Sequence, residues 1–209
     1  MVRVKICGIT DVEDALHAVG AGADALGFVF HDKSLRYVSP EHAKEIIGAL
    51  PSFVQTVGLF VNSEAGFING ISDRCGLDIV QLHGDEPPEY CELIRRRVIK
   101  AFRVRDVKSL DTVRNYRVAG ILLDAYSPHA YGGTGLTFDW EFARRVSEHG
   151  PIILAGGLTP DNVREAVNKV TPYAVDVSSG VESDPGRKDP QKVSDFIRRA
   201  KDNRIYLNP

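Results

Sequence analysis

The sequence contains little cysteine and no long hydrophobic run. Its three cysteines, Cys7, Cys75 and Cys91, are odd in number and show no CxxC spacing, so neither a disulfide framework nor a zinc site is predicted. The six histidines are scattered without an HExxH pair, and we expect no bound metal. The apolar runs are about one strand long, well short of the ~20 residues that cross a bilayer. The first residues also lack the apolar core of a signal peptide, so we expect no membrane partner and a reduced, cytoplasmic setting.

The charge of the chain is nearly balanced. Lysine and arginine together number 26, and aspartate and glutamate 28, which gives a formal net charge of −2. Nucleic acids and anionic membranes favour a basic surface, so we expect no nucleic-acid partner. Hydrophobic residues make up 43% and charged residues 26%, which is the composition of an ordinary globular protein with a sizeable core.

Short apolar runs recur along the chain and predict eight strands, each followed by a helical segment. The predicted strands are 3–9, 25–30, 55–62, 79–84, 98–104, 120–125, 151–157 and 174–180.

Helix signals lie between the predicted strands. Ser39 is a helix cap with Pro40 at the first helical position, and Thr159 with Pro160 repeats this arrangement. A last helix is predicted over 189–201. Strands that alternate with helices in this way favour parallel pairing through right-handed crossovers.

The predicted fold class is α/β, a single (β/α)8 TIM barrel over residues 1–209. No Pro/Gly/Ser-rich linker and no shift in composition divides the chain. The alternative is an open α/β sheet in which two strands are miscounted. Residues 202–209 are expected either to form a loose tail or to pack on a partner.

In such a barrel the functional residues lie where the strands end. Alternate side chains of a strand face the interior, so Cys7 and Asp124 are both predicted to point into the mouth. A free cysteine is most often a small buried hydrophobe, which is our interpretation of Cys75 and Cys91 within helical segments. Cys7 instead ends a strand beside Gly8, and with Asp124 it forms a candidate acid–base pair.

The same alternation turns further polar side chains inward. In the fourth strand these are Gln81 and His83, and His83 is expected to contact the substrate. Lys5 in the first strand faces Asp176 in the eighth across the seam of the barrel, and we interpret an ion pair between them as structural.

Two neighbouring strand ends are rich in glycine and serine. Gly156 and Gly157 end the seventh strand, and Ser178, Ser179 and Gly180 end the eighth. Backbone N–H groups at such ends bind anions, and phosphate sites in these barrels lie after strands 7 and 8. A small phosphorylated molecule is therefore the expected ligand, with simple tight turns as the alternative explanation.

Two loops at the same rim carry further candidates. The loop after the second strand contains Lys33 and Arg36. The default interpretation of both is that they are solvent-exposed surface charges. Arg36 could instead bind a carboxylate through two hydrogen bonds from its guanidinium. The loop after the sixth strand, 126–140, is long and rich in glycine, which suits a cover over the site.

These residues fall within motifs that resemble phosphoribosylanthranilate isomerase of tryptophan biosynthesis. The motifs are KICGIT, GADALGFVF, S-L-R-Y-V-S-P, VGLFVN, VQLHGDE, LLD…YGGTG-TFDW, LAGGLTPDNV and VDVSSGVE, followed by G-KD, and they run in the family's order from residue 3 to near residue 200. The resemblance implies a barrel enzyme that converts N-(5-phosphoribosyl)anthranilate to 1-(2-carboxyphenylamino)-1-deoxyribulose 5-phosphate by an Amadori rearrangement, without cofactor or metal. We expect a monomer or a homodimer.

The resemblance also implies a role for each candidate. Asp124 would be the general acid that opens the ribose ring, and Cys7, as a thiolate, the general base at C2. Arg36 would hold the anthranilate carboxylate, and the glycine and serine ends the phosphate. This chemistry calls for a raised pKa at the donating carboxyl and a lowered pKa at the accepting thiol.

Two other functions remain open from the residues. The related isomerase of histidine biosynthesis performs the same rearrangement, but an aspartate usually stands where Cys7 stands, and two phosphate half-sites are expected there. No second Gly-Gly end follows the third or fourth predicted strand. The other is a non-catalytic sensor of phosphorylated ligands, which would not need both Cys7 and Asp124.

Overall fold

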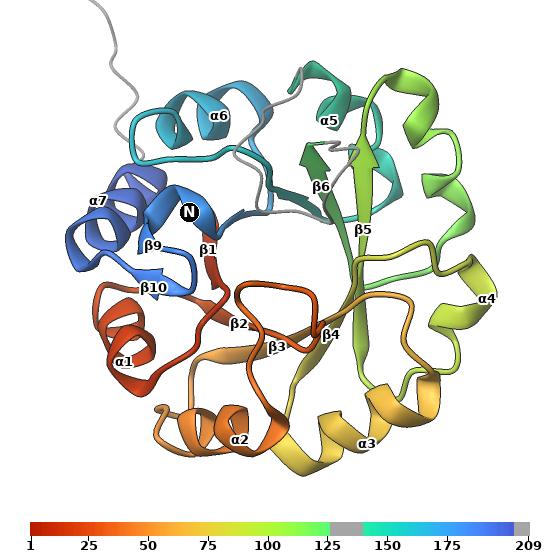
Figure 1. Cartoon of the computed structure of the whole chain (residues 1–209). Coiled ribbons are helices and arrows are strands. Elements are labelled where there is room, and N and C mark those ends of the chain that lie inside the picture. Colours follow the sequence, from red (N-terminus) through yellow and green to blue (C-terminus); the bar gives the residue numbers. More distant parts are fainter. Residues whose placement is uncertain (126–139, 203–209) are drawn as a thin grey trace, which may run out of the picture.

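Eight parallel strands close into a barrel in the computed structural model, which describes residues 1–125 and 140–202. Each strand pairs with the next along the chain, and the last pairs with the first (Figure 1). The strands are β1 (Arg3–Cys7), β2 (Ala25–Val29), β3 (Gln55–Phe60), β4 (Ile79–Leu82), β5 (Arg97–Val104), β6 (Gly120–Ala125), β7 (Ile152–Leu154) and β8 (Ala174–Val177). The predicted barrel is confirmed, and the open sheet is wrong.

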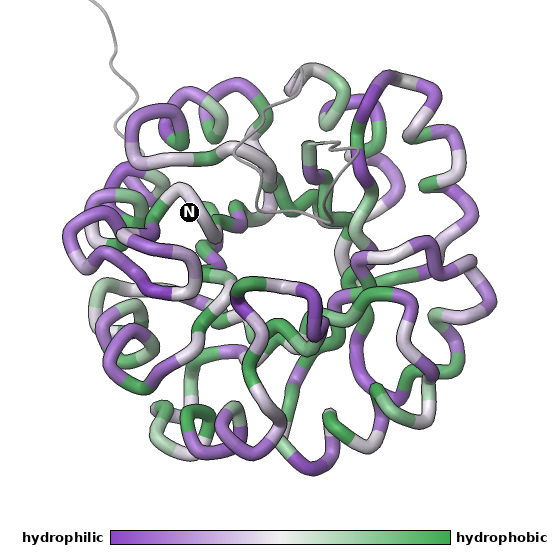
Figure 2. The backbone as a smooth tube through the Cα atoms, viewed as in Figure 1, coloured by the Kyte–Doolittle hydropathy of each residue, from purple (hydrophilic) through white to green (hydrophobic). Residues whose placement is uncertain are grey.

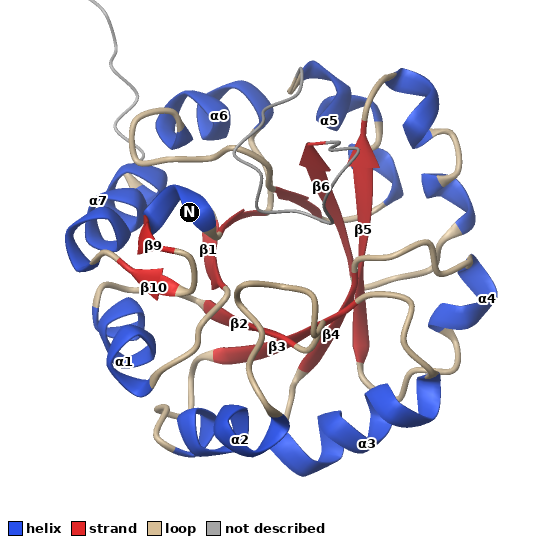
Figure 3. Cartoon of the chain, viewed as in Figure 1, coloured by secondary structure: helices blue, strands red, loops and turns tan. Residues whose placement is uncertain are grey.

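Helices surround the strands as an outer ring (Figure 3). The α-helices are α1 (Val12–Gly20), α2 (Pro40–Gly48), α3 (Ala65–Cys75), α4 (Pro88–Cys91), α5 (Glu141–Arg145), α6 (Val163–Val170) and α7 (Pro190–Lys201). Between β5 and β6 the described chain forms two short 3₁₀ helices, Val107–Leu110 and Val113–Asn115, in place of an α-helix. This crossover is therefore the thinnest part of the described ring.

One of the two predicted caps is confirmed and the other is wrong. The Ser39 hydroxyl accepts a hydrogen bond from the backbone N–H of His42 at 3.2 Å, and α2 begins at Pro40. By contrast, α6 begins only at Val163 and not at Pro160. The reason is a local turn, because the side chain of Asn162 accepts from the N–H of Thr159 and donates to the carbonyl of Gly157.

Two of the predicted strands extend further at their carboxyl ends than the strands of the structure, at positions where polar rim residues follow the apolar run. The first strand was predicted to reach residue 9 but ends at Cys7, and the eighth was predicted to reach residue 180 but ends at Val177. After β8 the chain forms a hairpin that the sequence did not predict, with strands β9 (Glu182–Asp184) and β10 (Arg187–Lys188). This hairpin lies beside α1 and β1 at the seam of the barrel (Figure 1).

The hydrophobic core has two parts, one on each side of the barrel wall. Most buried apolar side chains lie between strands and helices, among them Val4, Ile6 and Phe28. A smaller cluster fills the barrel interior and includes Leu122 of β6 and Ile153 of β7. Figure 2 shows the resulting pattern, with hydrophobic residues along the barrel wall and hydrophilic ones on the outer helices. The predicted inward and outward faces of the first and sixth strands are confirmed.

Cys75 lies in α3 and Cys91 in α4, and both are buried free thiols, as the helical patterns predicted. Across the described ranges, no helix has the length and apolar character needed to span a membrane. Within those same ranges, no group of three or more histidine, cysteine or acidic side chains is placed to hold a metal ion. The cover predicted over 126–140 and the tail predicted over 202–209 lie outside the described residues, except for Trp140 and Asp202.

Candidate active site

A cavity opens at the carboxyl ends of the barrel strands. All nine residues that the sequence singled out for the site line this one cavity: Cys7, Arg36, His83, Asp124, Gly156, Gly157, Ser178, Ser179 and Gly180. Lys33, the other cation considered in the loop after β2, does not line it. The closed barrel thus brings together residues from positions 7 to 180 of the chain.

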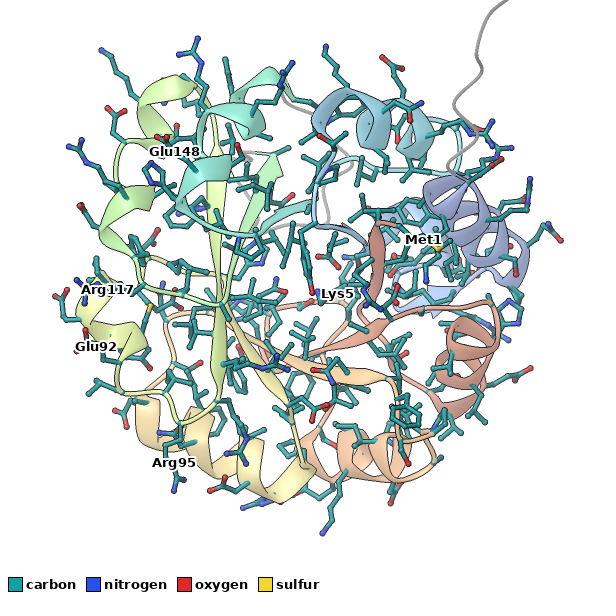
Figure 4. All side chains as sticks on the ribbon, turned by 180° about the vertical axis from the view of Figure 1, so that it is seen from behind. Met1, Lys5, Glu92, Arg95, Arg117 and Glu148 are labelled. Carbon is teal, nitrogen blue, oxygen red and sulfur yellow. The ribbon has the colours of Figure 1, made fainter. Side chains whose placement is uncertain are left out.

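The predicted ion pair between the first and last strands lies inside the barrel, and its Asp176 lines the cavity. Lys5 Nζ lies 2.9 Å from Asp176 Oδ1, and both residues are buried. The pair spans the register contact Lys5↔Asp176 of β1 and β8. Figure 4, which views the barrel from behind, labels Lys5 within the ring of strands. Burial opposes a charge on this ammonium, but Asp176 and Cys7 together raise the pKa of Lys5 above its ordinary value.

Cys7 ends β1 directly above this ion pair and is only 4% exposed. Burial raises the pKa of the Cys7 thiol, and this outweighs the opposing effects of Lys5 and Lys188. The expectation of a lowered thiol pKa is therefore wrong. The physical reason is that the free-energy cost of removing a thiolate from water exceeds its stabilisation by the two nearby cations.

Asp124 ends β6 and is hydrogen-bonded on both of its oxygens. Oδ1 accepts from the backbone N–H of Ala125 at 2.9 Å, and Oδ2 lies 3.2 Å from Nε2 of His83. The other ring nitrogen of His83, Nδ1, lies 2.9 Å from Nε2 of Gln81. Gln81, His83 and Asp124 thus form a buried row that runs across the barrel from β4 to β6.

Arg36 projects from the loop after β2 and meets an acidic partner that sequence reasoning missed. Its Nε and Nη2 donate to the two oxygens of Glu182 at 2.9 and 2.7 Å. Glu182 also pairs with Lys188 at 2.8 Å, and Lys188 Nζ donates to the carbonyl of Cys7 at 2.6 Å. Although burial opposes its ionisation, Arg36 and Lys188 together hold the pKa of Glu182 below its usual range. The only signal in the sequence was the end of the last motif, where Glu182 and Lys188 both occur.

At the ends of β7 and β8, backbone groups line the cavity. Gly156 has φ +81°, and a Cβ there would lie 2.9 Å from Asp124 Oδ1 and 2.4 Å from the Ala125 nitrogen. Only glycine tolerates this conformation and this proximity. Within the described chain, the N–H of Gly157 donates no hydrogen bond and the buried hydroxyl of Ser178 has no partner. These groups are donors without a protein acceptor, as an anion site requires.

Comparison with known proteins gives a consistent match over nearly the whole chain. The family model described as N-(5'phosphoribosyl)anthranilate (PRA) isomerase matches residues 4–199. A protein of Geobacter sulfurreducens named N-(5'-phosphoribosyl)anthranilate isomerase is 70% identical over 201 residues, which are 96% of this chain and 99% of that protein.

Two crystal structures show the same fold. One is described as phosphoribosyl anthranilate isomerase in complex with reduced 1-(o-carboxyphenylamino)-1-deoxyribulose 5-phosphate; it has a TM-score of 0.88 and 48% identity, and the match covers 96% of this chain and 99% of that one. The other is described as mutually generated monomers of the dimeric isomerase from Thermotoga maritima. Its TM-score is 0.87 at 47% identity, with the same coverage of 96% and 99%.

Proposed function

Because the chain belongs to the N-(5'-phosphoribosyl)anthranilate isomerase family, we propose that it carries out the Amadori rearrangement of tryptophan biosynthesis with Cys7 as general base and Asp124 as general acid. The substrate is N-(5-phosphoribosyl)anthranilate and the product 1-(2-carboxyphenylamino)-1-deoxyribulose 5-phosphate.

The observation that supports this assignment is the meeting of two proton-transfer groups in one cavity. Cys7 comes from β1 and Asp124 from β6, and both line the mouth. An aldose-to-ketose shift donates a proton at one atom and removes a proton at another, so it needs two such groups.

In the first step Asp124 gives its proton to the ring oxygen of the ribose. The bond between C1 and that oxygen breaks, and the lone pair of the anthranilate nitrogen forms the C=N bond of a protonated Schiff base. Cys7 then removes the proton from C2, and the electrons of that C–H bond neutralise the Schiff base and leave an enolamine. Tautomerisation places a hydrogen on C1 and a ketone at C2. The rearrangement has no net oxidation, and the proposal therefore includes no cofactor.

The charges around the cavity suit a substrate with two anionic ends. Arg36 would receive the anthranilate carboxylate through the guanidinium N–H groups that Glu182 leaves free, since Glu182 engages Nε and one bond of Nη2. Gly157, Ser178 and Gly180 would receive the phosphate through backbone and hydroxyl donors.

The remaining expectations follow from the family. We propose that all 209 residues form one unit that acts in the cytoplasm on this small phosphorylated molecule, as a monomer or a homodimer. One related isomerase at 47% identity is described as dimeric, and sedimentation equilibrium of the purified protein distinguishes the two states.

The test of the function is the loss of fluorescence when the protein is mixed with freshly made N-(5-phosphoribosyl)anthranilate. Cys7→Ser and Asp124→Asn should each lower kcat by ~10²–10⁴, the usual contribution of an acid–base group. Cys75→Ser is the matched control, because Cys75 is a buried thiol in α3, and it should keep kcat.

Three outcomes would overturn the proposal or one of its parts. Binding of the substrate without any turnover would favour a sensor of phosphorylated ligands. Turnover of the histidine-pathway substrate alone would favour that isomerase. A Cys7→Ser variant with wild-type kcat would show that another group is the base.

A further inference from the structure

Gln81, His83 and Asp124 form a buried row that is connected by hydrogen bonds. The three residues are 0%, 4% and 5% exposed, so bulk water does not supply their hydrogen bonds. Gln81 Nε2 lies 2.9 Å from His83 Nδ1, and His83 Nε2 lies 3.2 Å from Asp124 Oδ2. Each group in the row therefore depends on the next one for its partner.

The orientation of the Gln81 amide corresponds to one tautomer of His83. With the amide nitrogen facing Nδ1, the amide donates and Nδ1 accepts, so the ring proton lies on Nε2. Nε2 then donates to Asp124, whose other oxygen accepts from the N–H of Ala125. In this arrangement Asp124 is a carboxylate with both oxygens acting as acceptors.

A general acid must also exist in its protonated form. When Asp124 carries its proton on Oδ2, that oxygen becomes a donor, and Nε2 of His83 must accept. The ring proton of neutral His83 then sits on Nδ1, and Gln81 must accept it. The oxygen of Gln81, Oε1, is buried and has no hydrogen-bond partner among the described residues. A half-turn of the amide brings this unused oxygen to Nδ1.

We propose that Gln81 is a positioning residue, which acts through His83 to hold the Asp124 carboxyl in place in both of its protonation states. The amide of Gln81 carries both a donor and an acceptor, so this side chain can pair with both forms of the row. This inference rests on the proposed role of Asp124 as general acid.

Other charged groups near the row are already paired with one another. Arg103 of β5 lies beside Asp124 in the register of β5 and β6. The ion pairs around the mouth are Lys5 with Asp176, Arg36 and Lys188 with Glu182, and Arg103 with Asp85. Cys7 and His31 are the other titratable residues, within the described part of the chain, that line the cavity beside them. Among the described residues, the oxygen of Gln81 is thus a hydrogen-bonding group without a partner beside the ring of His83.

The first test is the ring tautomer of His83, measured by ¹⁵N NMR of its two ring nitrogens. In the free protein we expect the Nε2–H tautomer, because the amide nitrogen of Gln81 faces Nδ1 at 2.9 Å. In Gln81→Glu, whose ionised carboxylate only accepts, we expect the Nδ1–H tautomer. The same tautomer in both proteins would overturn the proposal. This measurement needs no turnover, so it remains informative even if the proposed reaction is wrong.

The second test compares two substitutions of nearly the same shape. Gln81→Glu offers acceptors only, so His83 should keep its Nδ1 proton, and the alkaline limb of kcat/KM should move upward by about one pH unit or more. Gln81→Met offers neither a donor nor an acceptor, so kcat should fall roughly tenfold or more while KM changes little.

A matched control is Gln191→Met on the exposed side of α7, which should leave both measurements unchanged. Circular dichroism shows whether each variant folds, and if Gln81→Met does not, the tautomers of the wild-type protein and of Gln81→Glu still decide. A folded Gln81→Met variant with wild-type kcat and pH profile would show that Gln81 only fills space.

Discussion

Arg36 and Glu182 form a two-pronged ion pair, with Nε at 2.9 Å and Nη2 at 2.7 Å from the carboxylate, although 146 positions separate them in the chain. Two parallel bonds fix the plane of a guanidinium, whereas a single bond leaves it free to rotate. Glu182 is itself held by Lys188, whose Nζ also binds the carbonyl of Cys7. The orientation of Arg36 is therefore tied to the strand that carries the proposed base.

Substitution of Glu182 by Gln tests this connection. Gln keeps the shape but loses one charge-assisted bond to Arg36, so we expect KM to rise by roughly tenfold to a hundredfold. kcat should change much less, because Glu182 does not contact the reacting atoms in the proposal. Steady-state kinetics with N-(5-phosphoribosyl)anthranilate measures both.

A double-mutant cycle gives the control. In an Arg36→Ala background, Glu182→Gln should raise KM no further, because its effect passes through Arg36. Glu45→Gln removes an exposed carboxylate on α2 and should leave KM unchanged. Tighter substrate binding in Glu182→Gln would instead mean that Glu182 chiefly neutralises the cations of the site.

Glu182 should also contribute to the acid sensitivity of the fold. Its pKa is lower in the folded protein than the value of about 4.3 expected when unfolded. The stabilisation is therefore fully present above the unfolded pKa and is lost as the pH falls through the folded pKa. Urea unfolding at pH 7 should show Glu182→Gln to be less stable than wild type by about 3 kcal/mol. This difference should shrink below pH 4, and a difference that is constant with pH would contradict the assignment.

The pH dependence of kcat/KM should reflect the burial of Cys7. Burial raises the pKa of this thiol, so the acidic limb should lie above the ordinary thiol pKa of about 8.5 in the free enzyme. Site-resolved alkylation of Cys7 against pH gives the same value independently. An acidic limb near pH 6 would mean that the thiol titrates in a more favourable setting than the described residues provide.

Gly180 tests the backbone approach between the ends of β7 and β8. A Cβ at this position would lie only 1.9 Å from the carbonyl oxygen of Leu158, so Gly180→Ala must push the two loops apart. We expect a loss of stability of about 1–3 kcal/mol, together with weaker binding of inorganic phosphate as measured by calorimetry.

The control for this variant is Gly70→Ala in the middle of α3, where a Cβ meets nothing within 4 Å. It should stabilise the protein by about 0.5–1 kcal/mol, because alanine is the better helix former. Unchanged phosphate binding in Gly180→Ala would exclude this strand end from the anion site.

Much of the fold could be predicted because the barrel repeats one local pattern. The alternation of side chains in β1 and β6 correctly turned Cys7 and Asp124 inward, and it placed Lys5 opposite Asp176. Strand ends were less predictable, because apolar residues such as Ile9 continue past the end of β1 and pack in the core, and the N–H of Ile9 still donates to the carbonyl of Gly27 in β2. The false cap at Thr159 has a similar cause, since the bonds of Asn162 form a turn first.

The site residues that lie on the strands were predicted from the sequence. The contacts between segments distant in sequence were missed. Periodicity reports which way a side chain faces, but it does not report which loop cation meets which acid. The pairing of Arg36 with Glu182 needs the hairpin β9–β10 to form beside the loop after β2, and two short strands made of polar and charged residues carry no hydrophobic pattern. The pKa of Cys7 likewise depends on burial by the assembled barrel.

The contacts between β1 and the last part of the barrel can form only late during synthesis on the ribosome. Lys5 and Cys7 leave the ribosome near the beginning, but Asp176 and Lys188, which bind them, follow 171 and 181 positions later. Until then Lys5 has no counter-ion, so the first strand gains little from entering an apolar interior. We expect nascent chains that stop before residue 188 to be inactive even with all eight barrel strands made. Degradation of such incomplete chains would remove no enzyme activity, because the contacts around Cys7 are complete only after residue 188 has been translated.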